Sequence, residues 1–192
     1  MNKKIVLTLG VLITAISFSV FAVKKKEKKS STVPTEIQWI TVPELEQKMK
    51  KEPRKIIFDF YTSWCGWCKV MDKKTYSNKE LAQYVNKNYY AVKFDAESKE
   101  PVTYMGKTYN FKPEYKANEF AVQMMNGQMS YPTTVIAAPD MSYVNPIPGY
   151  QRVDQMETLL KFFVANPTPS QELWTNFARD FKPSWTPDPS AE

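Results

Sequence analysis

The feature that most constrains the fold is a near-continuous apolar run at Lys55–Tyr61, with the sequence Lys-Ile-Ile-Phe-Asp-Phe-Tyr. An apolar run of this length, without strict alternation, is the pattern of a buried strand in a parallel sheet. Asp59 is an anomalous charge inside this run. Thr62 and Ser63 then turn the chain, and the next segment begins a helix. The run therefore predicts a central strand that feeds directly into a helix.

Similar patterns predict the other elements. Apolar runs predict strands at Tyr89–Asp95, Pro132–Ala137 and Ser142–Ile147, and alternation predicts a hairpin at Val102–Tyr109 that turns at Gly106. Helices are expected after two capping boxes, Thr41 with Glu44 and Ser77 with Glu80, and at residues 65–74, Glu114–Asn126, Asp154–Val164 and Gln171–Phe181. This order of elements predicts an α/β sandwich with one mixed sheet.

Cys65 and Cys68 are the only cysteines of the chain, which has no histidine. Their C-x-x-C spacing allows a reversible disulfide or part of a metal site. Zinc needs four ligands, usually Cys and His, so a zinc site would require a second chain or carboxylates. A structural disulfide across so short a loop would remove little entropy from the unfolded chain. The pair is therefore interpreted as a redox dithiol.

The positive charge of the chain is concentrated near its N-terminus. Residues 1–29 carry seven lysines and one glutamate, and the remaining residues have no net charge. Charge therefore gives no support to nucleic-acid binding by the domain. The apolar run Ile5–Val23 lies between two lysine clusters and predicts a cleaved export signal or an uncleaved membrane anchor. Both outcomes place the domain outside the cytoplasm, where thiols meet oxidising conditions.

The segment Phe58–Lys69 resembles the active-site segment of thioredoxins. Five features occur together: a buried strand with an Asp near its end, an aromatic pair, Trp64 before the first cysteine, Gly66 after it, and Lys69 after the second cysteine. The following segment, Val70–Tyr76, is more similar to exported thiol:disulfide interchange proteins than to cytosolic thioredoxin. The resemblance implies a thioredoxin fold, with a central mixed β-sheet flanked by helices.

Two more distant positions extend the resemblance. Tyr131 and Pro132 are similar to the cis-proline loop of thioredoxins, and Lys93 lies where thioredoxins carry a lysine near the buried Asp. The resemblance covers about residues 38–165. We expect residues 1–23 to be a signal peptide or anchor and residues 24–37 to be a linker. Residues 38–165 would form the thioredoxin-like domain, and residues 166–192 a C-terminal extension.

Two departures from thioredoxins affect the expected chemistry. The dipeptide between the cysteines is Gly66-Trp67, whereas reducing thioredoxins carry Gly-Pro and oxidases carry Gly-His or Pro-His. Residues 98–120 form an insert before the cis-proline strand. We expect the dipeptide to affect the redox potential and the insert to affect the choice of partner.

The catalytic roles follow from where the residues lie. Cys65 at a helix N-terminus sees unpaired N–H groups and the positive dipole end, which lower its pKa from about 8.5 and make it the nucleophile. Cys68, one turn further in, is expected to resolve the mixed disulfide. Burial should raise the pKa of Asp59 and make it the acceptor of the Cys68 proton. Lys93 is expected to pair with Asp59; the alternatives are that Asp59 only ends the strand or caps the helix, and that Lys93 is a surface lysine.

The substrate is expected to bind around the cysteines. A cis Pro132 would sit against the dithiol, and the backbone of Tyr131 would pair with an extended substrate by strand addition. Trp64 and Trp67, which flank the thiols around Gly66, are expected to form an apolar platform for partner chains. The alternatives are an ordinary turn proline and tryptophans that simply pack.

Two further groups of residues are interpreted as structural. The aromatic residues of the extension are expected to pack back on the domain, and the methionines before the cis-proline are expected to fill the core rather than bind copper. These groups are Trp174, Phe177, Phe181 and Trp185, and Met124, Met125 and Met129.

Together these arguments predict an exported thiol-disulfide oxidoreductase of the bacterial periplasm, anchored to the inner membrane if residues 5–23 stay uncleaved. It would act on protein thiols and disulfides, take electrons from a membrane donor, and use no metal, nucleic acid or cofactor beyond the Cys65–Cys68 disulfide. The lack of histidine between the cysteines favours reduction or isomerisation. Two alternatives stay open: a peptide-binding module with idle cysteines, and a Cu(I) metallochaperone that binds through both thiolates.

Overall fold

The structure is a computed structural model that describes residues 33–186. The expected signal or anchor at residues 1–23 and most of the expected linker lie outside the described residues. Between residues 33 and 186, no helix combines the length and the apolar character needed to cross a membrane.

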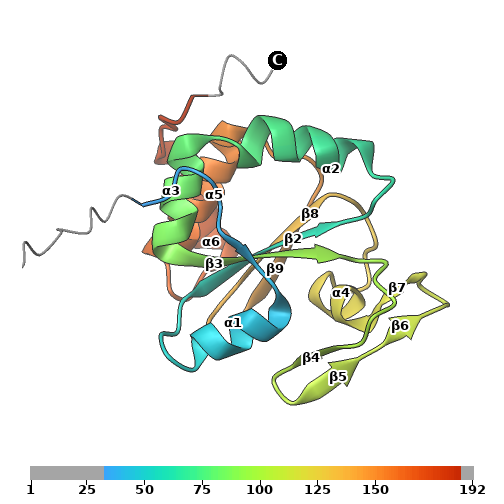
Figure 1. The fold of residues 1–192 in the computed structure, drawn as a ribbon. Coiled ribbons are helices and arrows are strands. Elements are labelled where there is room, and N and C mark those ends of the chain that lie inside the picture. Colours follow the sequence, from blue (N-terminus) through green and yellow to red (C-terminus); the bar gives the residue numbers. More distant parts are fainter. Residues whose placement is uncertain (1–32, 187–192) are drawn as a thin grey trace, which may run out of the picture. The chain divides into compact units, whose positions relative to one another are not determined.

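A mixed five-stranded sheet forms the centre of the domain (Figure 1), in the order β1-β3-β2-β8-β9. The strands β1, β2 and β3 run parallel, and β8 and β9 follow in antiparallel pairing. Their bounds are Trp39–Ile40, Lys55–Tyr61, Tyr89–Asp95, Thr133–Ala137 and Val144–Pro148 for β1, β2, β3, β8 and β9. The strand β2 lies between two neighbours, and its apolar side chains are buried because helices cover both faces of the sheet, which confirms the expected central strand.

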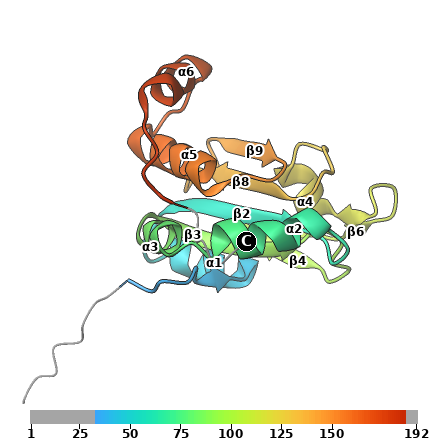
Figure 2. The same cartoon turned by 90° about the horizontal axis from the view of Figure 1, so that it is seen from above.

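Helices cover both faces of the sheet (Figures 1 and 2). One face packs against α2, a π-helical turn η1, α3 and α5, whereas the other packs against α1 and α4. The bounds are Val42–Met49, Gly66–Met71, Asp72–Tyr76, Lys79–Asn88, Glu119–Met124 and Val153–Ala165 for α1, α2, η1, α3, α4 and α5. Alternation along β2 sends Phe58 and Phe60 to the α1 face and Ile57 to the α3 face. Asp59 has the same parity as Ile57 and therefore points towards α2 and η1.

The expected insert is built from two small hairpins (Figure 1). The strands β4 and β5 turn at Met105 and Gly106, both with positive φ, as the alternating pattern predicted. A second hairpin, of β6 and β7, follows. The bounds are Val102–Tyr104, Lys107–Tyr109, Phe111–Lys112 and Ala117–Asn118 for β4, β5, β6 and β7. Tyr104 and Tyr109 bury their rings against Phe120, at centroid distances of 5.6 and 5.3 Å, so the insert shares the core of the domain.

The helix expected at Glu114–Asn126 is wrong at its start, because α4 begins only at Glu119. Asn118 is the reason. Its Oδ1 accepts the N–H of Phe120 at 3.0 Å and caps the helix, while its amide group donates to the carbonyls of Ser98 and Glu100. These bonds hold residues 117–118 in an extended strand.

Three other local predictions need correction. The helix after the cysteines ends at Met71 and continues as the π-helical turn η1 rather than as α-helix. Asn78, not Ser77, caps α3, because the Asn78 side chain accepts the N–H of Leu81 while the Ser77 hydroxyl donates to the carbonyl of Lys73. The two-residue strand β1 was not predicted, since so short a segment carries no periodicity.

The C-terminal extension folds back onto the domain, as the sequence predicted. The helix α6, Gln171–Asp180, contacts α5 through Phe162, whose ring lies 5.1 Å from Trp174 and 5.5 Å from Phe177. Beyond α6 the chain returns, and Trp185 is buried against Tyr84 at 5.4 Å. Figure 2 shows α6 stacked beyond α5, away from the sheet.

Candidate active site

The two cysteines lie where β2 passes into α2. Cys65 is the N-cap of α2, and its sulfur accepts the N–H of Cys68 at 3.0 Å. The two residues form a disulfide bond with an S–S distance of 2.11 Å, and both are buried. A sulfur that accepts a backbone N–H at a helix start is in the position that favours a thiolate after reduction. Cys65 therefore occupies the expected nucleophile position.

Asp59 lies on β2, on the sheet face that α2 and η1 cover, and is only 2% exposed. Its Oδ2 accepts from the ammonium of Lys93 at 2.9 Å, and its Oδ1 has no hydrogen-bond partner among the described residues. Burial raises the pKa of Asp59 to about 6, although the charge of Lys93 opposes the shift. A buried carboxylate with a pKa near neutrality is suited to accept a proton.

Lys93 pairs with Asp59 as predicted, because the two residues lie directly opposite one another in the β2–β3 register. It also pairs with Asp72 of η1, which the sequence prediction missed. The rings of Trp39, Tyr61 and Tyr76 lie 5.4, 5.1 and 5.9 Å from its ammonium group. Burial lowers the pKa of Lys93, but the two carboxylates outweigh this effect and raise it overall. Lys93 is therefore a charged member of the site and not a strand-edge surface lysine.

The peptide bond between Tyr131 and Pro132 is cis, as the resemblance implied. The carbonyl of Pro132 accepts the N–H of Gly149 at 2.8 Å, and the Thr133 hydroxyl donates to the carbonyl of Ser130 at 2.7 Å. These bonds hold the loop before β8 in place. Tyr131 contacts Trp64, so the loop lies beside the dithiol.

Two aromatic pairs flank the disulfide. Trp64 and Trp67 are 64% and 63% exposed. The ring of Trp64 meets the ring of Tyr131 edge-on at 5.9 Å, and the ring of Trp67 lies 5.7 Å from the ring of Tyr150. Gly66 between the cysteines is exposed, with open space where a side chain would be. The arrangement leaves exposed apolar surface next to the dithiol.

Sequence reasoning missed several residues of this site, including Tyr150, Glu97 and Asp72. The indole N–H of Trp64 donates to Glu97 at 3.0 Å, and Glu97 follows the end of β3 by two positions. Since the carboxyl ends of parallel strands meet at one edge of a sheet, Glu97 could have been placed near Cys65 from the sequence. Asp72 lies one helical turn beyond Cys68, which also places it on the same face.

The three methionines before the cis-proline pack into the core. Met124 and Met125 are buried, and Met129 packs against the same cluster. This confirms their interpretation as core residues.

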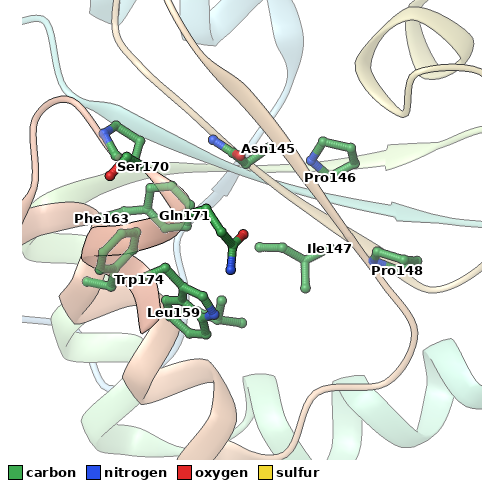
Figure 3. Close-up of a pocket in the computed structure, with 11 residues that line it drawn as sticks. Asn145, Pro146, Ile147, Pro148, Leu159, Phe163, Ser170, Gln171 and Trp174 are labelled. Atoms are coloured by element: carbon green, nitrogen blue, oxygen red, sulfur yellow. The ribbon is translucent and has the colours of Figure 1, made fainter. Parts of the chain in front are cut away.

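A cavity of about 390 Å³ lies elsewhere, between β9, α5 and α6 (Figure 3). Its walls include Ile147, Phe163 and Trp174. None of the predicted site residues lines it, so the candidate site is the dithiol and its surroundings.

Comparison with known proteins agrees with this geometry. A family model described as "Thioredox_DsbH: Protein of unknown function, DUF255" matches residues 29–164. A protein of Caenorhabditis elegans described as uncharacterized is 28% identical over 103 residues, which cover 54% of this chain and 12% of that protein. Spermatogenesis-associated protein 20 of Rattus norvegicus is 25% identical over 120 residues, or 59% of this chain and 14% of that protein. The chain thus spans a small part of the length of these relatives.

Among solved structures, a thioredoxin-fold protein from Helicobacter pylori has a TM-score of 0.51 and 17% identity, covering 77% of this chain and 88% of that chain. This likeness shows the thioredoxin fold. A structure described as DsbH oxidoreductase has a TM-score of 0.48 and 17% identity, covering 76% and 95%.

Proposed function

Because this chain belongs to the Thioredox_DsbH family, we propose that it is a thiol-disulfide oxidoreductase that reduces or isomerises disulfides in protein substrates. The single observation that carries the proposal is the dithiol at the start of α2, backed by a buried carboxylate. Cys65 caps the helix, Asp59 lies on the sheet face that this helix covers and has a pKa of about 6, and Pro132 lies in the loop whose Tyr131 contacts Trp64. These parts together suit thiolate chemistry on a disulfide.

The reaction would proceed in two exchanges. In the reduced protein, the Cys65 thiolate attacks one sulfur of a substrate disulfide, which releases one substrate thiolate and forms a mixed disulfide. The Cys68 thiol then loses its proton to Asp59, and the resulting thiolate attacks the Cys65 sulfur. This step releases the second substrate thiolate and forms the Cys65–Cys68 disulfide. Two electrons pass from the dithiol to the substrate.

The substrate would bind as an extended chain across the aromatic surface. Trp64 and Trp67 are exposed next to the cysteines in the chain, and the ring of Tyr131 contacts the ring of Trp64. Backbone pairing there would hold many sequences, while the tryptophans would favour apolar residues beside the substrate cysteine.

The direction, the electron donor and the location are further parts of the proposal. The absence of histidine between the cysteines supports reduction or isomerisation over oxidation. A reductase outside the cytoplasm needs electrons delivered across a membrane, so we propose a membrane donor. The apolar run Ile5–Val23 supports export to the periplasm, with anchoring to the inner membrane if the run is not cleaved.

The test is the reduction of insulin by the full chain in the presence of dithiothreitol, followed as turbidity. We expect clear acceleration by the native chain and none by Cys65→Ser, since this variant lacks the attacking thiolate. Thr108→Ser, a conservative change on the exposed strand β5, serves as the control and should act like the native chain. Equal rates for the native chain and Cys65→Ser would sink the proposal.

The same Cys65→Ser variant separates the two alternatives. A peptide-binding module would keep partner binding after this change. A Cu(I) metallochaperone would lose its copper affinity in both Cys65→Ser and Cys68→Ser, and titration with Cu(I) would detect the loss.

A further inference from the structure

Lys93 joins two carboxylates that lie in different surroundings. One is Asp59, buried in β2 at 2.9 Å from the ammonium, and the other is Asp72 on η1, whose side chain is 45% exposed. Lys93 itself is 25% exposed. The three side chains therefore form a row of two ion pairs that extends from the buried Asp59 to the partly exposed Asp72.

The position of Asp72 is tied to the dithiol. The π-helical turn η1 follows α2 without interruption, and the backbone N–H of Asp72 donates to the carbonyl of Cys68. The segment that carries the resolving cysteine thus also carries the exposed carboxylate. Because π-helical turns are rare and often occur at functional sites, this one merits a functional explanation.

Solvent reaches these groups from the side of β1 and η1. A cavity of about 500 Å³ there is lined by Trp39, Asp72, Tyr76 and Lys93, among others, and by residues 35–37. Neither cysteine lines it. Lys93, the ion-pair partner of Asp59, therefore meets solvent in a cavity that neither cysteine lines.

Four elements place titratable or polar groups towards Asp59. Lys93 comes from β3, Asp72 and Tyr76 come from η1, Tyr61 lies on the same strand, and Thr134 lies opposite on β8. The Tyr76 hydroxyl is hydrogen-bonded to Thr134 at 3.1 Å. Lys93 lowers the pKa of Asp59 and Asp72 raises it, so the shared lysine couples the two carboxylates.

We propose that Asp72 is a positioning residue for the proton-transfer step, because it shares Lys93 with Asp59 and so sets how readily Asp59 takes the Cys68 proton. The step moves one proton from the Cys68 sulfur to Asp59 and leaves a thiolate that attacks the Cys65 sulfur; the proton then leaves to solvent. The proposal rests on the proposed dithiol function. The Oδ1 of Asp59, which has no partner among the described residues, can take the proton without breaking a hydrogen bond.

The test uses the reduced full chain and 5,5′-dithiobis(2-nitrobenzoic acid) as the disulfide. Attack by Cys65 releases a first thionitrobenzoate, and attack by Cys68 on the mixed disulfide releases a second one. Stopped-flow absorbance separates the two phases. The pH midpoint of the second phase reports the ionisation of Asp59, because only its carboxylate form can accept the Cys68 proton.

In the Asp72→Asn variant, Lys93 pairs with Asp59 as its single carboxylate partner and lowers the pKa of Asp59 further. We expect the midpoint of the second phase to fall by about half a pH unit or more, and the plateau rate to fall a few-fold because Asp59 becomes a weaker base. Asp72→Glu should restore the native profile. In a Lys93→Met background, the Asp72→Asn change should lose most of its effect on the midpoint.

The matched control is Asp180→Asn, which removes an exposed carboxylate on α6 that pairs with Arg179. An unchanged midpoint in Asp72→Asn, equal to that of Asp180→Asn, would overturn the inference. Absence of the second release in the native chain would instead refute the dithiol function itself. A first-phase rate equal to that of the native chain shows that the surroundings of Cys65 are intact in each variant, since an unfolded chain would expose both thiols and react at a different rate.

Discussion

At the scale of single residues, Asp59 is the residue of the site whose burial is unfavourable for folding. An ionised carboxylate in a buried strand is unfavourable, and Lys93 offsets only part of this cost, so the pKa of Asp59 is raised from 3.8 to about 6. The same burial that destabilises the charged form makes the carboxylate a usable base near neutral pH. Function and stability therefore oppose one another at this position.

This opposition predicts the effect of Asp59→Asn on stability. A carboxylate with a raised folded-state pKa destabilises the fold increasingly as pH rises from about 4 through 6. The variant should therefore be more stable than the native chain by about 1–3 kcal/mol at pH 7 and close to it at pH 4. Urea unfolding of the oxidised protein at both pH values measures the difference. A destabilised variant at pH 7 would contradict this account.

At the scale of elements, a second buried carboxylate has a pKa that is lowered overall, in contrast to Asp59. Glu157 of α5 is fully buried and accepts from the N–H groups of Ser184 and Trp185, each at 2.7 Å. It also pairs with Lys161 at 2.6 Å. Burial raises the pKa of Glu157, but these donors outweigh it and lower the pKa overall. Glu157 therefore fastens the C-terminal extension to α5.

Glu157→Gln tests this attachment. A glutamine would place amide hydrogens beside some of the groups that now donate to the Glu157 carboxylate. We expect the free energy of unfolding to fall by about 2–4 kcal/mol at pH 7. Because the folded-state pKa is lowered, the native contribution is present above the unfolded pKa of 4.5 and fades as pH falls through the folded value. Urea unfolding against pH measures it, with Glu172→Gln on the exposed start of α6 as the control. A native-like variant at pH 7 would show that the donors find other acceptors.

At the scale of the whole molecule, the site lies at the end of the central strand, between elements that pack on opposite faces of the sheet. The central strand β2 connects to α2 on one face, while the chain from β3 leads into the insert on the other. Asn118 N–H donates to the carbonyl of Ala96 at 2.7 Å, and Ala96 N–H donates to that of Tyr61. These bonds connect the insert to Tyr61 at the end of β2, and we expect the insert to affect the choice of partner.

The redox potential is a property of this whole arrangement. We expect a value closer to about −270 mV than to about −120 mV, because no histidine lies between the cysteines to stabilise the reduced form. Equilibration of the full chain in glutathione buffers, read by tryptophan fluorescence, measures it, since Trp64 and Trp67 flank the disulfide. Cys65→Ser should show no transition. A value near the oxidising end would make the protein a disulfide donor and reverse the proposed direction.

Much of the fold could be predicted from local patterns. The buried run of β2, the turn at Gly106 and the capping box at Thr41 each depend on a few neighbouring residues, and each is present. The start of α4 could not be predicted in this way, because Asn118 is held by carbonyl groups about twenty positions earlier in the chain.

The sequence by itself determined the dithiol, the buried Asp59 and the chemistry that they allow, because an isolated C-x-x-C pair without histidine leaves few other uses. The tertiary structure decided which groups surround them. Asp72 joins the expected pair of Lys93 and Asp59, and Trp67 meets Tyr150, only because the packing of η1, the strands and the loops brings together residues far apart in the chain. Local patterns carry no record of such contacts, since their geometry exists only after the sheet and helices have packed.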